Sequence, residues 1–373
     1  MNAATSTKDT QRRTELRTAL DGVRVFDGES MSAPRTVILR DGLITGDTDM
    51  TGARVVDGYG ATLLPGLIDA HVHLHDRASL DKLAAHGVTT AFDMACWPVS
   101  LVDSLRERSG TADVRSAGLP AIGPGGHHAK LPGMPDAAVV LDPAQARAFV
   151  AARIGEGSDY IKVVLEGAGQ GGPDQATVDA LVVAAHAAEK KVFAHAVVAE
   201  AYEMALSAGV DAITHLPVGA PLPPDLIARL AEGRTIVIPT LTMMEGILQA
   251  FGAPPQAFAG MLPGIAALCE AGVPVLAGTD ANTEPGVPFN AEHGASLHHE
   301  LELLVAAGLT CAEALRSATS EPARHLCLPD RGAIRQGLRA DLLLVDGDPL
   351  ADIRATSKVV KVWCAGIEVE AAS

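Results

Sequence analysis

Two histidines one residue apart, His71 and His73, close an apolar run that begins at Leu63. Side chains at positions i and i+2 of a β-strand point to the same side, so both imidazoles would project together from a strand end. Imidazole nitrogens are common ligands of zinc and related divalent ions. The pair therefore predicts a metal-binding site at the end of a strand.

Further residues that could belong to a metal site lie in other short apolar runs or directly after them. Lys162 lies within residues 160–164, where an unpaired ammonium would be costly to bury. The remaining three each end or directly follow a run, and they are His195, His215 and Asp280. If the runs are parallel strands of one barrel, their carboxyl ends meet at one mouth, and all six side chains would converge there.

The elements that would position these residues alternate between short apolar runs and alanine-rich helical stretches, an order typical of a parallel α/β sheet. The helical stretches include 179–189, 199–208 and 298–307, and the candidate strands are 67–73, 89–94, 115–121, 160–164, 191–195, 212–215, 235–239 and 274–277. Eight units of about 30 residues each predict a TIM (β/α)8 barrel. The alternative is an open doubly wound sheet, but no GxGxxG turn follows the first strand.

Both ends of the chain show short β-branched runs separated by Asp-Gly turns, which indicate a small antiparallel sheet. We expect three parts. Residues 1–17 form an N-terminal tail, 18–64 together with 332–373 form a small β-sandwich domain, and 65–331 form the barrel.

Composition limits the classes of partner. Of the 373 residues, 48% are hydrophobic and 20% are charged, and the formal net charge of −16 argues against nucleic acid or an anionic membrane. Five scattered cysteines without a CxxC pair favour reduced thiols, and neither an apolar signal segment nor a membrane-spanning run is visible. We expect a cytoplasmic protein that acts on a small molecule. Whether it forms a homo-oligomer is left open.

Several motifs carry a family resemblance. They are Pro65-Gly66-Leu67-Ile68-Asp69-Ala70-His71-Val72-His73, then Asp330-Arg331-Gly332-Ala333-Ile334, Ala340-Asp341-Leu342-Leu343-Leu344-Val345 and Asp348-Pro349-Leu350. With them the chain resembles the amidohydrolase superfamily over nearly its whole length. Within it, the chain is similar to the imidazolonepropionase-related branch that contains prolidase-like dipeptidases and amidases.

The resemblance implies a ligand set for two divalent metal ions, usually zinc. His71, His73 and Asp280 would hold the α metal, His195 and His215 the β metal, and Lys162, N6-carboxylated by CO₂, would bridge them. One departure is visible at the sixth strand, where the family often has Glu-His-Gly and this chain has Thr214-His215-Leu216.

The resemblance also implies a reaction. A hydroxide shared by two metals would attack the carbonyl of an amide, and Asp280 would act as general base and then as general acid. The substrate would be a dipeptide, an N-acyl amino acid or a hydrophobic amide. The branch often has Gly-Gly-His after the third strand, which implies His127 as a contact to substrate or oxyanion.

Alternatives remain at this point. A mononuclear deaminase of a nitrogen heterocycle would not need Lys162, whereas lactone or phosphotriester hydrolysis would use the same binuclear site. A catalytically inactive scaffold is disfavoured because all six positions are intact. Trp97, Met243 and Met244 are candidates either for a hydrophobic pocket or for ordinary packing, and Arg77 is a candidate for a substrate carboxylate.

Overall fold

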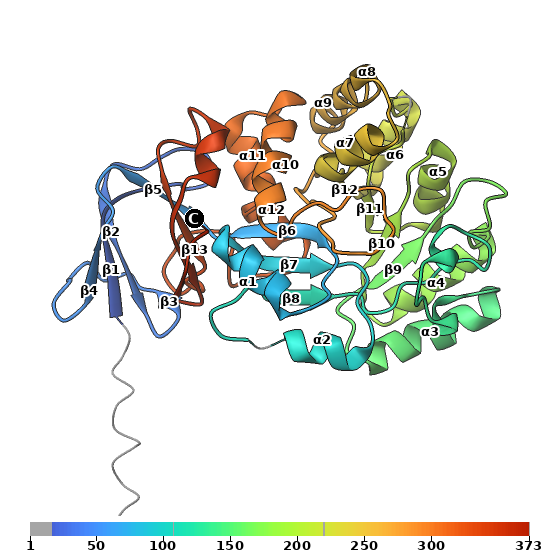
Figure 1. Ribbon diagram of the computed structural model, residues 1–373, viewed down its shortest axis with the longest axis horizontal. Coiled ribbons are helices and arrows are strands. Elements are labelled where there is room, and N and C mark those ends of the chain that lie inside the picture. Colours follow the sequence, from blue (N-terminus) through green and yellow to red (C-terminus); the bar gives the residue numbers. More distant parts are fainter. Residues whose placement is uncertain (1–16, 107, 219–220, 373) are drawn as a thin grey trace, which may run out of the picture.

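The computed structural model describes residues 17–106, 108–218 and 221–372, and the expected N-terminal tail lies outside these residues except for Arg17. The described chain is an α/β protein with parallel sheets. Figure 1 shows strands from both chain ends on one side and the helix-covered parallel strands on the other.

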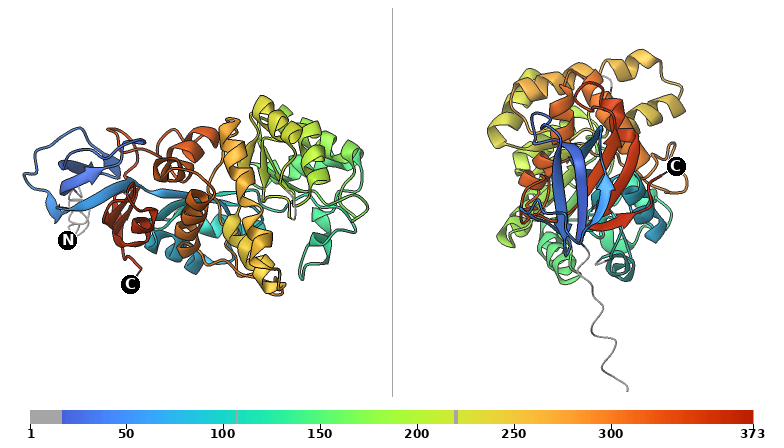
Figure 2. Two further views of the ribbon diagram at one scale, coloured as in Figure 1. Left: turned by 90° about the horizontal axis from the view of Figure 1, so that it is seen from above. Right: turned by 90° about the vertical axis from the view of Figure 1, so that its left-hand side faces the viewer.

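The two ends of the chain build one eight-stranded sheet. Its order is β15-β14-β13-β5-β1-β2-β3, and β4 pairs with β1 off this path. Figure 2 shows the N-terminal and C-terminal strands side by side. The strands are β1 (Arg17–Val25), β2 (Arg35–Arg40), β3 (Leu43–Ile44), β4 (Arg54–Asp57), β5 (Ala61–Pro65), β13 (Leu342–Asp346), β14 (Val359–Cys364) and β15 (Ile367–Val369).

This sheet differs in two ways from the expectation. It is mixed rather than antiparallel, because β1 pairs with β2 in antiparallel fashion but runs parallel to both β4 and β5. It is also a single sheet in the described residues, so a sandwich of two stacked sheets is not confirmed. Trp363 and Leu63 are fully buried in its apolar core.

The C-terminal strands lie directly against the strand that leads to His71. β13 pairs antiparallel with β5, with Leu343 opposite Leu64, and only Gly66 separates β5 from β6. The Gly66 N–H donates to the Asp341 carbonyl, and a Cβ at position 66 would come within 2.2 Å of Thr89 Oγ1. Glycine is therefore required at this link between the sheets.

Two parallel sheets carry the strands expected from the alternating pattern. One has the order β6-β7-β8 and the other β12-β11-β10-β9. Their strands are almost wholly buried because helices cover them, which explains why the sequence shows continuous apolar runs there. The bounds are β6 (Leu67–Val72), β7 (Val88–Asp93), β8 (Asp113–Ser116), β9 (Ile161–Val164), β10 (Val192–His195), β11 (Ala212–Thr214) and β12 (Ile236–Ile238).

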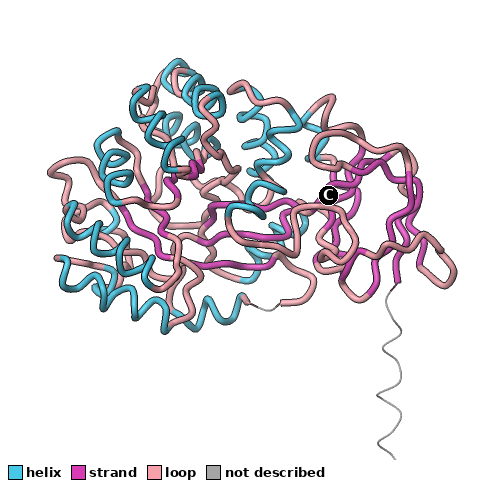
Figure 3. Tube along the Cα trace, turned by 180° about the vertical axis from the view of Figure 1, so that it is seen from behind, coloured by secondary structure: helices cyan, strands magenta, loops and turns pink. Residues whose placement is uncertain are grey.

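The helices lie around the outside of these strands (Figure 3). Several begin at the capping residues that the sequence offers: Asp142 and Asp174 cap α3 and α4, and Thr310 forms a capping box with Glu313 at α11. The α-helices are α1 (Arg77–Ala85), α2 (Val99–Leu105), α3 (Pro143–Gly155), α4 (Gln175–Ala187), α5 (Ala199–Ala208), α6 (Pro224–Gly233), α7 (Leu241–Ala250), α8 (Pro255–Ala259), α9 (Leu262–Glu270), α10 (Ala295–Ala306), α11 (Cys311–Ser317) and α12 (Ser320–His325). Short 3₁₀ turns are η1 (His128–Lys130), η2 (Asp136–Ala138) and η3 (Ile353–Ser357).

The eighth expected strand, 274–277, is not a strand in the structure. It contributes one isolated parallel bridge, from Val275 to Val237 in β12, and the Ala70 N–H of β6 donates to the Ala277 carbonyl. Another bridge joins Ala121, after β8, to Val163 in β9. Backbone hydrogen bonds thus link the two parallel sheets on both sides, although no single closed sheet is present in the described chain.

In the part of the chain that the structure describes, no helix combines the length and apolarity that crossing a membrane would require.

Candidate metal centre

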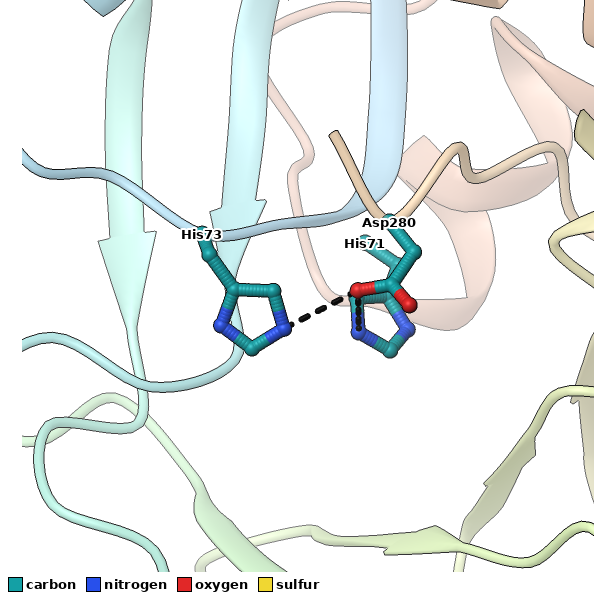
Figure 4. A group of neighbouring side chains, drawn as sticks. All are labelled: His71, His73 and Asp280. Carbon is teal, nitrogen blue, oxygen red and sulfur yellow. Dashed lines mark ion pairs between the residues drawn. The ribbon is translucent and has the colours of Figure 1, made fainter. Parts of the chain in front are cut away.

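The first group of converging side chains is His71, His73 and Asp280. His71 lies in the fully buried strand β6, His73 follows it, and Asp280 comes from the segment after residues 274–277. Asp280 Oδ1 is 3.2 Å from His71 Nε2 and 3.0 Å from His73 Nε2. Figure 4 shows the three side chains pointing toward one another.

These three donors fit a divalent metal ion. Their ligand atoms all lie within 4.8 Å of one another, and two imidazoles with one carboxylate are a donor set that zinc accepts. Ligands about 2.0 Å from one tetrahedral ion lie about 3.3 Å apart, close to the two observed contacts. No other set of three His, Cys, Asp or Glu side chains within residues 17–106, 108–218 and 221–372 has this spacing.

Buried Asp69 links the two backbone segments that carry this group. Its Oδ1 accepts the His71 N–H at 3.1 Å and its Oδ2 accepts the Thr279 hydroxyl at 2.7 Å, while the Asp280 N–H donates to the His71 carbonyl. Burial raises the pKa of Asp69 to about 7. Asp69 thus joins β6 to the segment that carries Asp280, a role that the sequence alone did not reveal.

The second group is Lys162, His195 and His215, from β9, β10 and the end of β11. The rings of His195 and His215 have centroids 4.4 Å apart, and the His71 ring lies 5.1 Å from that of His215. Lys162 Nζ donates to Thr214 Oγ1 at 2.9 Å. Thr214 therefore contacts the lysine directly. It occupies the position at which the family that this chain resembles often has glutamate.

Burial keeps most of these groups uncharged. It lowers the pKa of His71 to about 4 and the pKa of Lys162 to about 7, and it holds the pKa of His195 and His215 well below the usual histidine range. Burial alone would raise the pKa of Asp280, but contacts with His71 and His73 outweigh it and keep this group a carboxylate. Unprotonated imidazoles and one carboxylate are the forms that bind metals.

The loop after β8 brings two histidines toward the second group. His128 lies with its ring centroid 4.8 Å from that of His195, whereas the exposed His127 is anchored by its backbone N–H, which donates to Glu166 Oε1 at 2.9 Å. A Cβ at Gly126 would come within 2.5 Å of Glu166 Oε1, which explains the glycine before them. The structure thus places His128, rather than the predicted His127, against a candidate ligand, and a role for His127 stays a prediction.

Both groups open into one cavity of about 370 Å³. All six predicted ligands line it, together with His127, His128 and the pocket candidates Trp97, Met243 and Met244. Other lining residues are mostly apolar, namely Met94, Ala95, Pro120, Leu131, Met134, Val164, Val197, Val218, Ile247, Val287, Pro288 and Phe289. Arg77 does not line the cavity and lies on the exposed first turn of α1, 3.8 Å from Asp81.

Residues 62–369 match the amidohydrolase family. This chain belongs to the amidohydrolase family. An uncharacterized protein of Mycobacterium tuberculosis (strain ATCC 25618 / H37Rv) is 32% identical over 313 residues, which cover 78% of this chain and 80% of that protein. Imidazolonepropionase of Deinococcus deserti is 32% identical over 170 residues, covering 45% of this chain and 38% of the enzyme. A solved Xaa-Pro dipeptidase with methionine bound in its active site shares the fold at TM-score 0.81 and 24% identity, covering 94% of this chain and 99% of that chain.

In this amidohydrolase, Thr240 and the residues around it support His215. His215 Nδ1 lies 2.7 Å from Thr240 Oγ1, and Thr240 precedes α7. Buried Glu300 of α10 accepts the N–H groups of Leu241 and Thr242 at 2.9 and 2.7 Å, so it caps α7 from outside the helix. His215, Thr240 and Asp280 have φ values of 72°, 49° and 58°, a left-handed conformation that is uncommon for residues other than glycine and is concentrated at functional sites.

Replacing Thr240 with valine is expected to lower metal affinity at the candidate centre by about 10–100-fold, because the His215 imidazole loses its orienting partner. The variant also leaves the buried Nδ1 of His215 without a hydrogen-bond partner, which should cost about 1–3 kcal/mol of stability. Metal titration of the apoprotein measures the effect. The matched control is Thr356→Val, since Thr356 lies 3.1 Å from Nδ1 of His298, a buried histidine that does not line the cavity. Equal losses in both variants would contradict a specific role of Thr240.

Metal affinity of this amidohydrolase is expected to fall as the pH is lowered. Burial alone would lower the pKa of His73, but its hydrogen bond and charge interaction with Asp280 outweigh burial and raise that pKa above the ordinary value. Below the raised pKa the bound proton must leave before a metal can bind, at a cost of about tenfold in affinity per pH unit. Competition with a chelator at a series of pH values measures this slope, and an affinity independent of pH would contradict it.

Proposed function

We propose that this amidohydrolase hydrolyses an amide C–N bond of a small molecule at a site that holds two divalent metal ions, with zinc as the expected ion. The observation that carries the proposal is the position of Lys162. A buried lysine, with its pKa lowered to about 7, lines the same cavity as His71, His73, His195, His215 and Asp280. A mononuclear deaminase would have no use for it.

In this proposal His71, His73 and Asp280 hold one ion, and His195 and His215 hold the other. Lys162 would be carboxylated: its neutral Nζ would add to the carbon of CO₂ and release one proton to water, which would leave a carbamate anion as a further ligand for the ions. Divalent ions bound there would lower the pKa of a water and polarise the scissile carbonyl. The strands that carry these residues would together form the (β/α)8 barrel expected for the family.

The residues of the chain supply the proton transfers. The Asp280 carboxylate accepts a proton from the attacking water and delivers it to the leaving nitrogen, so that water and amide yield a carboxylic acid and an amine. The imidazole N–H of His128, or of His127, can donate to the carbonyl oxygen as negative charge develops on it. The apolar wall excludes bulk water, which strengthens these interactions.

The test combines metal analysis with a hydrolysis screen. Protein saturated with Zn²⁺ in bicarbonate buffer should contain two ions per chain and should hydrolyse members of a panel of dipeptides, N-acyl amino acids and aryl amides. Adenine and other amino-substituted heterocycles should not be deaminated. One ion per chain with release of ammonia from a heterocycle would overturn the proposal in favour of deamination. Activity confined to lactones or phosphotriesters would also overturn it.

A further inference from the structure

The charges on the cavity wall point to a class of substrate. Among the residues that the structure describes, no arginine lines the cavity, and its one lysine is Lys162, which belongs to the candidate metal centre. The carboxylate side chains outside that centre are Glu166 and Glu284. Beyond the candidate ligands, the wall therefore holds two carboxylates, no arginine or lysine, and the polar side chains of His127, His128 and Asn282, and it is otherwise largely apolar.

We propose that this cavity selects uncharged, apolar amides and rejects amides with a free carboxylate, such as dipeptides and N-acyl amino acids. The inference rests on the proposed amide hydrolysis and narrows its substrate. Away from the candidate metal centre, a carboxylate in this cavity would lose its hydration without gaining an arginine or lysine as a partner, and it would face two negative groups.

Glu166 is fixed as an anion next to the candidate site. The His128 side chain, 3.6 Å from Glu166 Oε1, and the backbone N–H of His127 lower the pKa of this carboxyl group. Glu284 lies in the loop after Asp280, and its Oε1 is 3.8 Å from His75 Nε2. The two carboxylates come from separate loops, after β9 and after residue 280, and both line the cavity.

Three cationic side chains from neighbouring segments do not reach this cavity. Arg106 and Arg153 line a separate cavity of about 220 Å³ that shares only Trp97 with the first, and they pair with Asp159 and Glu156 at 2.8 and 2.6 Å. Lys130 is exposed on the same loop as His128 but does not line the cavity. None of these three side chains offers a partner to a carboxylate bound near the candidate metal centre.

The size and lining of the cavity fit this class. About 370 Å³ lies at the small end of the range for small-molecule sites, which is about 300–1,000 Å³. Met243, Met244 and Met134 supply flexible apolar contacts that adapt to ring or chain shapes, and Trp97 and Phe289 supply flat surfaces. A compact aryl or alkyl amide satisfies these walls without a charged group.

The test compares matched substrates on the Zn²⁺-loaded enzyme. N-benzoyl-leucinamide is compared with N-benzoyl-leucine, and acetanilide with its para-carboxylate. The neutral member of each pair should have a kcat/KM about 100-fold higher. Glu284→Gln should reduce the ratio of the two kcat/KM values, neutral over carboxylate, about tenfold. Glu245 pairs with a histidine outside the cavity, so Glu245→Gln should leave this ratio unchanged. Equal or faster hydrolysis of the carboxylates would overturn the inference, and loss of that activity in Lys130→Ala would identify the missed cation.

A binding measurement separates this inference from the proposed function. If no amide is hydrolysed, the same pairs can be titrated into metal-free protein, where a carboxylate has no metal to bind. Trp97 lines both this cavity and the cavity of about 220 Å³, whereas Trp363 is fully buried in the terminal sheet, so a fluorescence change is assigned to this cavity where Phe289→Ala weakens it. Tighter binding of the neutral members supports the inference even without turnover. Tighter binding of the carboxylates overturns it.

Discussion

Lys162→Ala is expected to lower kcat/KM about 10³-fold, because the proposed carbamate and the metal ion that it helps to hold are worth several kcal/mol. The metal content should fall from two ions per chain towards one. The cause is local, because Lys162 Nζ has one hydrogen-bond partner, Thr214 Oγ1, and no carboxylate within salt-bridge distance among the described residues. Metal analysis and steady-state kinetics measure both effects.

Two controls make this result specific. Propionate added to Lys162→Ala should restore part of the activity, because a free carboxylate can occupy the space of the missing carbamate. Lys191→Ala removes a half-buried lysine that pairs with Asp211 at the start of β10, and it should retain two metals and full activity. Full metal content and activity in Lys162→Ala would remove the main support for a binuclear site.

Asp280→Asn is expected to reduce kcat by about 10²–10⁴-fold, the usual contribution of a positioned general acid–base group. The amide keeps the shape of the side chain but cannot take up the proton. It also lacks the negative charge that, in the proposed site, would hold one ion together with His71 and His73, so affinity for that ion should fall while the ion proposed at His195 and His215 is retained. Kinetics at saturating Zn²⁺ separates the lost proton transfer from the lost metal.

Asp211→Asn serves as the matched control for that variant. Asp211 also contacts a histidine, His186 Nε2 at 2.9 Å, but it precedes β11 and does not line the cavity. Its substitution should leave kcat unchanged. A kcat near that of the wild type in Asp280→Asn would refute the proton transfer assigned to Asp280.

The strands that carry chemistry were predictable because their sequence signal is local. The runs at 67–73 and 191–195 correspond to β6 and β10, which are continuous apolar segments buried on both faces. The run at 274–277 gave the same signal but forms only an isolated bridge to β12, and its Ala277 N–H donates to the carbonyl of Ser317, the last residue of α11. Such a competing partner, distant in sequence, leaves no trace in a short apolar run.

In the candidate site too, some residues could be predicted from the sequence and others could not. His71, His73 and Asp280 could be predicted to meet because parallel strands end at a common edge. The residues beneath them could not. Asp69 accepts a hydrogen bond from Thr279, 210 residues away, and Glu300 accepts one from the backbone N–H of Leu241, 59 residues away. Neither pair follows a periodic pattern or a motif spacing that could be recognised in the sequence. The contact of His128 with His195 could not be predicted for a similar reason, since the orientation of a glycine-rich loop depends on its contact with Glu166.

The pairing of β5 with β13 has a consequence for biosynthesis. β5 runs through Gly66 into β6, which holds His71, yet its neighbour β13 is translated only after the whole segment from β6 to α12. The strand that leads into the candidate centre therefore cannot complete its hydrogen bonds on the ribosome until that segment and β13 have emerged. Because such long-range contacts form late, a nascent chain would pass through a stage with an exposed apolar strand edge, which makes it a client for chaperones.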